Sequence, residues 1–173
     1  MRFAYYDRLS PKEKAVYRAS DEVREVPLRD PSSIWPLVEV LRGALASGEL
    51  KQVERAAQSL VDALTAMVEV EPVRVQVLPE RPKFAEGGEL HGLYRWGEDE
   101  AEPPEIFLWM RTAAKARVVA FKTFLRTLLH EVLHHFDLAL LDLPASFHTQ
   151  GFFARESSLF HQLVTDTDHT SSS

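Results

Sequence analysis

Apolar side chains recur at three- and four-residue steps through two segments of the first half of the chain. The first segment runs from Ile34 to a stop at Gly48, and the second runs from Leu50 to a stop at Pro72. This spacing places apolar residues on one side of a helix, and glycine and proline are common helix terminators. The pattern therefore predicts two consecutive helices that form a helical layer over residues 34–70.

A shorter helix is expected ahead of this layer. The run Ser10-Pro11-Lys12-Glu13 places a serine at the N-cap, a proline in the first turn and a glutamate three residues after the serine. These are the residues of a capped helix start. We expect the helix to end near Ser20 and to be followed by a proline-containing connector, so that residues 1–33 form an N-terminal extension.

The pattern changes after the helical layer. Residues 73–77 alternate between valine and polar side chains, which is the two-residue period of a half-buried strand. Residues 90–96 and 105–111 are the next strand candidates, and the acidic, proline-containing run 97–104 separates them. These segments predict a small antiparallel sheet.

Helical spacing returns in the last third of the chain. It predicts one long helix over about residues 115–141 and a second over about 149–164, with a disordered tail over 165–173. Helices, then strands, then helices is the element order of an α+β fold. A chain of 173 residues is large enough for one core, so we expect a single domain, with residues 73–164 as its functional core.

The composition of the chain excludes several kinds of site and of protein. The chain has no cysteine, which excludes disulfides, thiol nucleophiles and cysteine-ligated zinc. No apolar run has the length of a signal peptide or a membrane span, so a cytoplasmic protein is expected. The net charge of −6 argues against a broad nucleic-acid surface. A local basic group is interpreted as the solvated face of a helix: Lys115, Arg117, Lys122 and Arg126.

One motif inside the first of the two late helices has a specific chemical meaning. His130-Glu131-Val132-Leu133-His134 spells H-E-x-x-H. Two histidines four residues apart share one helix face and can bind one metal ion, and Glu131 can then act as general base on a water that the metal activates. The alternative is a pair of ordinary helix histidines. The metal site is favoured because apolar residues flank the motif at helical spacing and leave both histidines on a neighbouring face.

A catalytic zinc usually has three protein ligands, so a third must lie elsewhere. The candidates after the motif are Asp137, Asp142, His148, Glu156 and His161. His148 opens the last helix, and Glu156 lies two turns further on roughly the same face, so the residues alone leave both open. His161 is more plausibly a surface or packing residue.

Two further residues of the motif helix have open roles. Asp137 shares the face of His130 and His134, where it could accept the second N–H of a ligand histidine or be an exposed acid. His135 is expected to face solvent or to support the site from behind the ligands.

The motif and the run His148-Thr149-Gln150-Gly151-Phe152 together resemble the SprT-like zincin metallopeptidases, over roughly residues 73–164. In that family a third ligand histidine opens a helix in an H-G-x-x-F-like segment. The resemblance implies a zincin-like fold, to which this chain adds the N-terminal helical layer, and a Zn²⁺ ion held by His130, His134 and His148. It departs from the family pattern at Thr149, where the family has glycine.

Two other departures concern function. No cysteine zinc ribbon follows the motif, and no clear counterpart of the basic DNA-binding regions of some relatives is visible, which puts a DNA–protein crosslink role in doubt. The minigluzincins, small single-domain zincins, are a second family that the chain resembles. That resemblance would make Glu156 the third ligand.

These observations predict a zinc-dependent peptidase acting on a protein or peptide substrate, with Glu131 as general base. In zincins the strand before the motif helix binds the substrate as an added strand, so the resemblance implies this role for residues 105–111, which could equally be an ordinary sheet strand. The weak candidates for an oxyanion stabiliser are Tyr94, His91 and Arg155. The alternative is a non-catalytic zincin-fold module that binds a protein partner, or a peptidase kept latent because the N-terminal extension covers its cleft.

Overall fold

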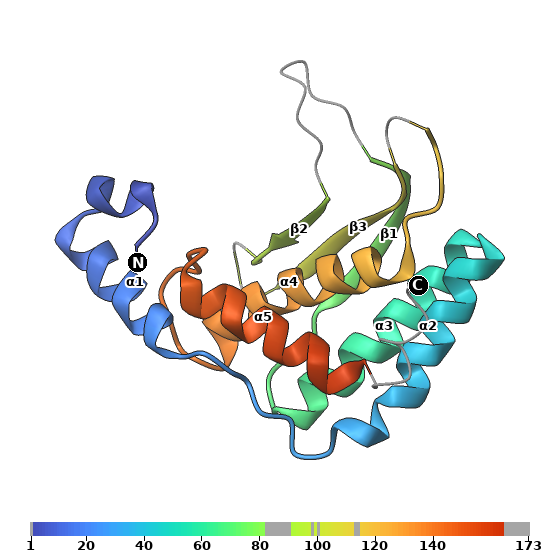
Figure 1. Cartoon of the computed structure of the whole chain (residues 1–173), viewed down its shortest axis with the longest axis horizontal. Coiled ribbons are helices and arrows are strands. Elements are labelled where there is room, and N and C mark those ends of the chain that lie inside the picture. Colours follow the sequence, from blue (N-terminus) through green and yellow to red (C-terminus); the bar gives the residue numbers. More distant parts are fainter. Residues whose placement is uncertain (1, 82–90, 98, 100, 113–114, 165–173) are drawn as a thin grey trace.

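The computed structural model describes residues 2–81, 91–97, 99, 101–112 and 115–164. Within them, helices come first, a small sheet follows, and two helices close the fold (Figure 1). The helices are η1 (Ala4–Arg8), α1 (Pro11–Glu22), η2 (Pro31–Ser33), α2 (Trp35–Ser47), α3 (Leu50–Met67), α4 (Phe121–Ala139) and α5 (Gln150–Leu163). The strands are β1 (Arg74–Glu80), β2 (Gly92–Arg95) and β3 (Glu105–Arg111). The predicted α+β order is confirmed, while the tail 165–173 lies outside the described residues.

The sheet is mixed, and the prediction of an antiparallel sheet was wrong. Its strand order is β1-β3-β2, with β1 parallel and β2 antiparallel to β3. The nearly continuous apolar run of β3 explains the central position, because a strand paired on both sides is largely buried. β2 is therefore an edge strand of the sheet.

Helices cover one face of this sheet (Figure 1). α3 packs on β1, and α4 packs on β2 and β3. The core between them is apolar and includes Val75 and Val77 of β1, Ile106 and Leu108 of β3, and Leu125, Leu128, Leu129, Val132 and Phe136 of α4. α4 is thus held firmly against the sheet, which fixes the positions of the motif residues that it carries.

The N-terminal extension forms part of the fold. α1 begins at the predicted capping box, in which the Ser10 and Glu13 side chains each bond the other's backbone N–H. Its C-terminal end packs against α5. The extension therefore contacts the helix that follows the third ligand candidate.

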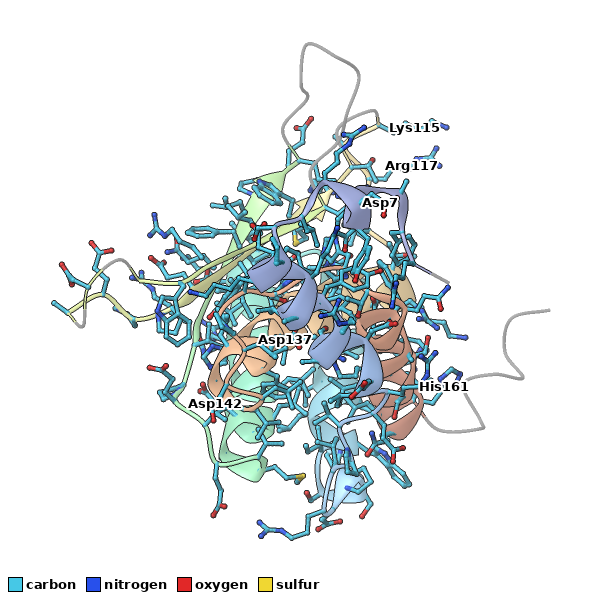
Figure 2. The ribbon with its side chains drawn as sticks, turned by 90° about the vertical axis from the view of Figure 1, so that its left-hand side faces the viewer. Asp7, Lys115, Arg117, Asp137, Asp142 and His161 are labelled. Carbon is cyan, nitrogen blue, oxygen red and sulfur yellow. The ribbon has the colours of Figure 1, made fainter. Side chains whose placement is uncertain are left out.

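The helix that carries the motif is shorter than predicted. α4 begins at Phe121, because residues 115–120 form a turn that pairs Val118 with Arg111. Lys115 and Arg117 precede the helix and lie at the periphery of the molecule, away from the interior Asp137 (Figure 2). The predicted basic group is consequently not one helix face. Among the described residues, no helix combines the length and apolar character needed to cross a membrane.

Candidate metal centre

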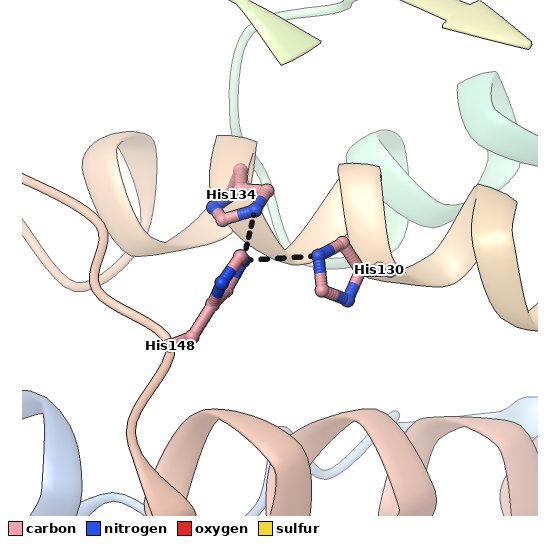
Figure 3. Close-up of side chains that lie close together, drawn as sticks. All are labelled: His130, His134 and His148. Carbon is pink, nitrogen blue, oxygen red and sulfur yellow. Dashed lines mark hydrogen bonds between the residues drawn. The ribbon is translucent and has the colours of Figure 1, made fainter. Parts of the chain in front are cut away.

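Three histidine side chains converge beside the C-terminal half of α4. His130 and His134 lie one turn apart on this helix, and His148 comes from the irregular connection between α4 and α5 (Figure 3). The Nε2 atom of His148 lies 3.1 Å from Nε2 of His130 and 3.0 Å from Nε2 of His134. Their ligand atoms form a group able to hold a metal ion, as the sequence predicted for these three residues.

Hydrogen bonds at the far side of each ring fix the tautomers of the two α4 histidines. Glu156 Oε2 lies 3.2 Å from Nδ1 of His130, and a carboxylate accepts, so this nitrogen carries the proton. Ser146 donates its hydroxyl hydrogen to Asp137, so its oxygen accepts from Nδ1 of His134 at 2.7 Å. Both Nε2 atoms therefore present lone pairs to the centre of the group.

The spacing of the nitrogens fits a metal ion. Two unprotonated nitrogens about 3 Å apart repel each other unless a cation or a proton lies between them. A tetrahedral zinc with bonds of about 2.0–2.1 Å holds its nitrogens about 3.3 Å apart. The 3.0 and 3.1 Å separations are close to this value. Neutral imidazoles also suit zinc, copper, iron and nickel.

Burial favours the neutral, metal-binding form of these rings. It lowers the pKa of His134 to about 3, with smaller contributions from His130 and His148. Burial likewise lowers the pKa of His148, with a smaller effect of His130 in the same direction. The buried ring of Phe152, on α5, lies behind the site, with its centroid 4.8–5.2 Å from those of all three imidazoles. The histidines are thus packed as well as hydrogen-bonded.

Glu131 lies beside the histidines and is almost completely buried. Burial raises the pKa of its carboxyl group to about 7, with Glu156 adding to the rise and His130 opposing it. Glu131, His130 and Gly92 line two adjoining cavities, of about 370 and 440 Å³. The larger of the two also includes His91, which keeps this residue beside the site.

β2 passes directly over the motif glutamate. A methyl group built on Gly92 would lie 2.9 Å from Glu131 Oε1 and 2.9 Å from the Thr127 methyl group. Any side chain at this position would have to displace its neighbours. Among the residues that the structure describes, β2, and not the predicted strand 105–111, has a free edge next to Glu131, since β3 pairs with a strand on both sides.

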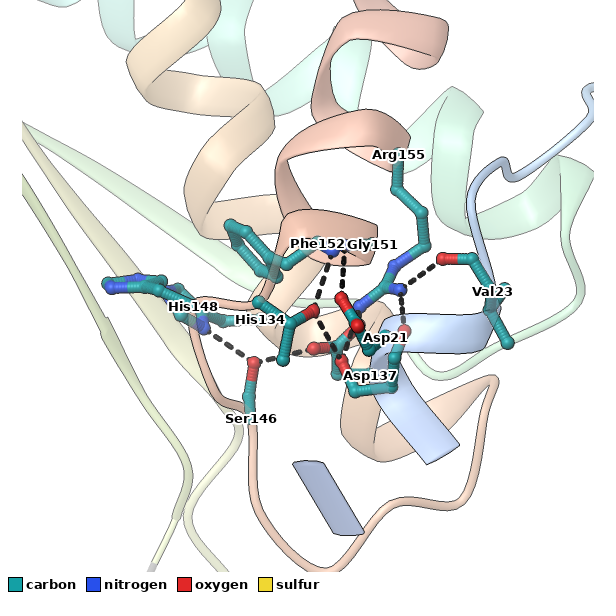
Figure 4. Close-up of polar contacts among 11 residues, drawn as sticks. Asp21, Val23, His134, Asp137, Ser146, His148, Gly151, Phe152 and Arg155 are labelled. Atoms are coloured by element: carbon teal, nitrogen blue, oxygen red, sulfur yellow. Dashed lines mark hydrogen bonds and ion pairs between the residues drawn. The ribbon is translucent and has the colours of Figure 1, made fainter. Parts of the chain in front are cut away.

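Glu156 and Asp137 both support ligand histidines. Glu156 bonds the outer nitrogen of His130, so it lies behind this ligand. The group able to hold the metal contains His148 and not Glu156 as its third residue. Asp137 was expected to accept from a ligand histidine or to be exposed. It is fully buried and reaches His134 through Ser146 (Figure 4).

Asp137 also forms a buried ion pair with Arg155. The distance from Arg155 Nη2 to Asp137 Oδ1 is 3.0 Å, and both side chains are fully buried. Arg155 donates further hydrogen bonds to Ser20 and to the carbonyl of Val23, at the end of α1. Its guanidinium is therefore engaged behind the site, which contradicts its candidacy as an oxyanion stabiliser.

His135 and Tyr94 bond each other. His135 is fully buried, so the expectation that it faces solvent was wrong. Its Nε2 lies 2.8 Å from the Glu71 carbonyl, which must accept, so Nδ1 is unprotonated and accepts from the Tyr94 hydroxyl at 3.0 Å. The Tyr94 hydroxyl hydrogen is thus already donated to His135, which makes Tyr94 a weaker candidate for an oxyanion donor. His161 is exposed, as predicted, and contacts the Ser157 carbonyl.

The N-terminal extension does not cover the two cavities. Their lining residues come from β2, α4, α5 and the segments that precede β2 and α5, and no described residue of 2–33 is among them. Aromatic side chains of the extension instead pack beside the connection that carries His148. Latency through a covered cleft therefore has no support in these contacts.

No known protein family matches this sequence, and neither a curated protein nor a solved structure matches the chain.

Proposed function

We propose that the protein is a zinc-dependent peptidase with a zincin-like catalytic centre. The observation that carries this proposal is the convergence of three imidazole Nε2 atoms beside the buried Glu131 carboxyl group. His130, His134 and His148 would hold the ion, which leaves one position of a tetrahedral zinc for water or substrate. A bound zinc supplies acidity to a water molecule and polarises a carbonyl group.

Glu131 supplies the proton transfer. Its carboxylate takes a proton from the attacking water as the new C–O bond forms, and it returns that proton to the amine nitrogen as the C–N bond breaks. A pKa of about 7 suits both steps near neutral pH, and the charge of a bound cation would oppose the rise that burial causes. The burial that raises this pKa also keeps competing water away from the carboxyl group.

The edge of β2 is the proposed site for an extended peptide. Added strands bind through backbone hydrogen bonds, and β2 has one edge that β3 does not occupy. The close approach of Gly92 to Glu131 would bring a peptide on this edge alongside the general base. The substrate class is therefore a protein or peptide segment that can adopt an extended conformation.

The test pairs metal analysis with peptide hydrolysis. We expect about one zinc per chain and cleavage of an unstructured protein such as casein. Glu131→Gln should retain zinc and abolish cleavage, because an amide cannot accept the proton. Glu156→Gln is the matched control, since it changes a nearby carboxyl group that bonds the outer nitrogen of His130, and it should still cleave at saturating zinc.

Two outcomes would contradict the proposal. A folded protein that takes up no zinc at neutral pH would remove the metal centre. Bound zinc without hydrolysis would instead support the alternative of a non-catalytic metal-binding module that acts through a protein partner. Equal hydrolysis by Glu131→Gln and the wild type would show that Glu131 is not the general base.

A further inference from the structure

We propose that residues 3–23, here called the N-terminal clamp, position two of the three metal ligands and thereby set the metal affinity of the site. The inference rests on the metal-binding part of the proposed function. The clamp is far from this ligand in sequence, because Tyr5, the clamp residue that contacts His148, precedes it by 143 residues.

His148 depends on tertiary contacts more than the other two ligands do. The backbone of α4 fixes His130 and His134 one turn apart, whereas His148 lies in the irregular connection that leads to α5. No regular ladder of backbone hydrogen bonds fixes that connection. Its conformation must come from the groups that pack against it, because an unsupported segment would have to be ordered when the metal binds.

The clamp holds this connection through Tyr5. The Tyr5 hydroxyl donates a 2.6 Å hydrogen bond to the backbone carbonyl of His148. Its ring also lies beside those of Phe147 and Tyr17, at centroid distances of 6.5 and 5.8 Å.

A second set of contacts joins the end of α1 to the start of α5. The hydroxyl oxygens of Ser20 and Thr149 are 3.3 Å apart, and Asp21 accepts from the Gly151 N–H at 2.9 Å. A methyl group built on Gly151 would lie 2.5 Å from the Asp21 carbonyl oxygen. Glycine is therefore what allows the clamp to approach the helix immediately after His148.

A third contact reaches the ligand His134. Arg155 donates to the Ser20 carbonyl at 2.6 Å on one side and to Asp137 at 3.0 Å on the other (Figure 4). Asp137 in turn accepts from Ser146, whose oxygen holds Nδ1 of His134. Clamp, ion pair and ligand thus form one chain of polar contacts, which is fully buried at Arg155 and Asp137 and half-buried at Ser146 and His134. A network with a buried centre of this kind tolerates little displacement.

The test compares Tyr5→Phe with Tyr6→Phe in the full chain. Both variants lose one hydroxyl from neighbouring tyrosines, but the Tyr6 hydroxyl bonds only Arg18, within the clamp. Zinc affinity is measured by competition with a chelator, and the geometry of the site by the visible absorption of cobalt-loaded protein. Amide hydrogen exchange of residues 143–149 is followed in metal-free protein.

Tyr5→Phe should weaken zinc binding about two- to tenfold, the range expected for one lost hydrogen bond. It should also change the cobalt spectrum and speed exchange over 143–149, while Tyr6→Phe should match the wild type in all three. Asp21→Ala perturbs the clamp at a separate contact, and it should act in the same direction as Tyr5→Phe.

Wild-type behaviour of Tyr5→Phe and Asp21→Ala in both exchange and zinc affinity would overturn the clamp. Equal effects of Tyr5→Phe and Tyr6→Phe would do the same, since they would indicate general destabilisation. A wild-type protein that binds no zinc would contradict the proposed function instead, and the exchange measurement on metal-free protein would still decide whether Tyr5 holds the connection.

Discussion

The buried carboxyl group of Glu131 should make the stability of the metal-free protein depend on pH. Burial raises its pKa from 4.5 to about 7 in the folded state. Between these values the folded protein binds a proton that the unfolded chain releases. The stability associated with Glu131 is therefore fully present below pH 4.5 and is lost as the pH rises through about 7.

The size of this effect follows from the shift. Each pKa unit corresponds to about 1.4 kcal/mol, so a rise from 4.5 to about 7 costs about 3 kcal/mol of stability at pH 8. Glu131→Gln resembles the protonated carboxyl group at every pH. The free energy of unfolding of this variant, relative to wild type, should therefore increase by about 3 kcal/mol between pH 4 and pH 8.

Urea unfolding with a chelator present measures this difference. Comparing the two variants at each pH removes contributions common to both, such as that of His134, whose pKa burial lowers and whose effect on stability has the opposite sign. Glu54→Gln is the control, because the pKa of Glu54 is shifted in the opposite direction. The hydrogen bond from the Val77 N–H is the largest cause of this shift and lowers the pKa. Its relative stability should fall, not rise, with increasing pH. A Glu131→Gln difference that stays constant from pH 4 to pH 8 would refute the reasoning.

Two further predictions concern the ligands and the edge strand. His148→Ala should weaken zinc binding by orders of magnitude. Glu156→Ala should lower the zinc affinity only about tenfold, the lower end for a group behind a ligand, because its 3.2 Å contact with His130 is long. The reverse ranking in a chelator titration would make Glu156 the ligand. Gly92→Ala should lower peptide hydrolysis about a hundredfold with zinc affinity nearly unchanged, since its methyl group would displace Glu131. Gly43→Ala, which has open space for a methyl group, is the control, and equal activity of the two variants would contradict the proposed substrate path.

Sequence alone was sufficient for the parts of the site that one helix determines. His130, Glu131 and His134 follow from helical spacing, and their common location needs no other segment. His148 was reached by combining the expected turn before α5 with a family resemblance. The structure places it with the other two histidines.

The errors concern contacts between distant segments. Nothing near His135 in sequence indicates that Tyr94 and the Glu71 carbonyl will enclose it. Similarly, Ser146 and Tyr5 look like ordinary loop and surface residues until the fold brings them to the ligands. The central position of β3 did have a signal, because its apolar side chains occupy both faces, as expected for a strand paired on both sides.

The Asp137–Arg155 ion pair has a consequence for the order in which parts of the metal centre can form. Arg155 belongs to α5, so a chain that ends within α4 carries Asp137 without its partner. Burying an unpaired carboxylate is energetically unfavourable, so the side chains around the motif histidines should not pack until Arg155 is present. The three histidines should therefore come together only when α5 joins α4 to the end of α1, and a chain that ends before Arg155 should not form the metal centre.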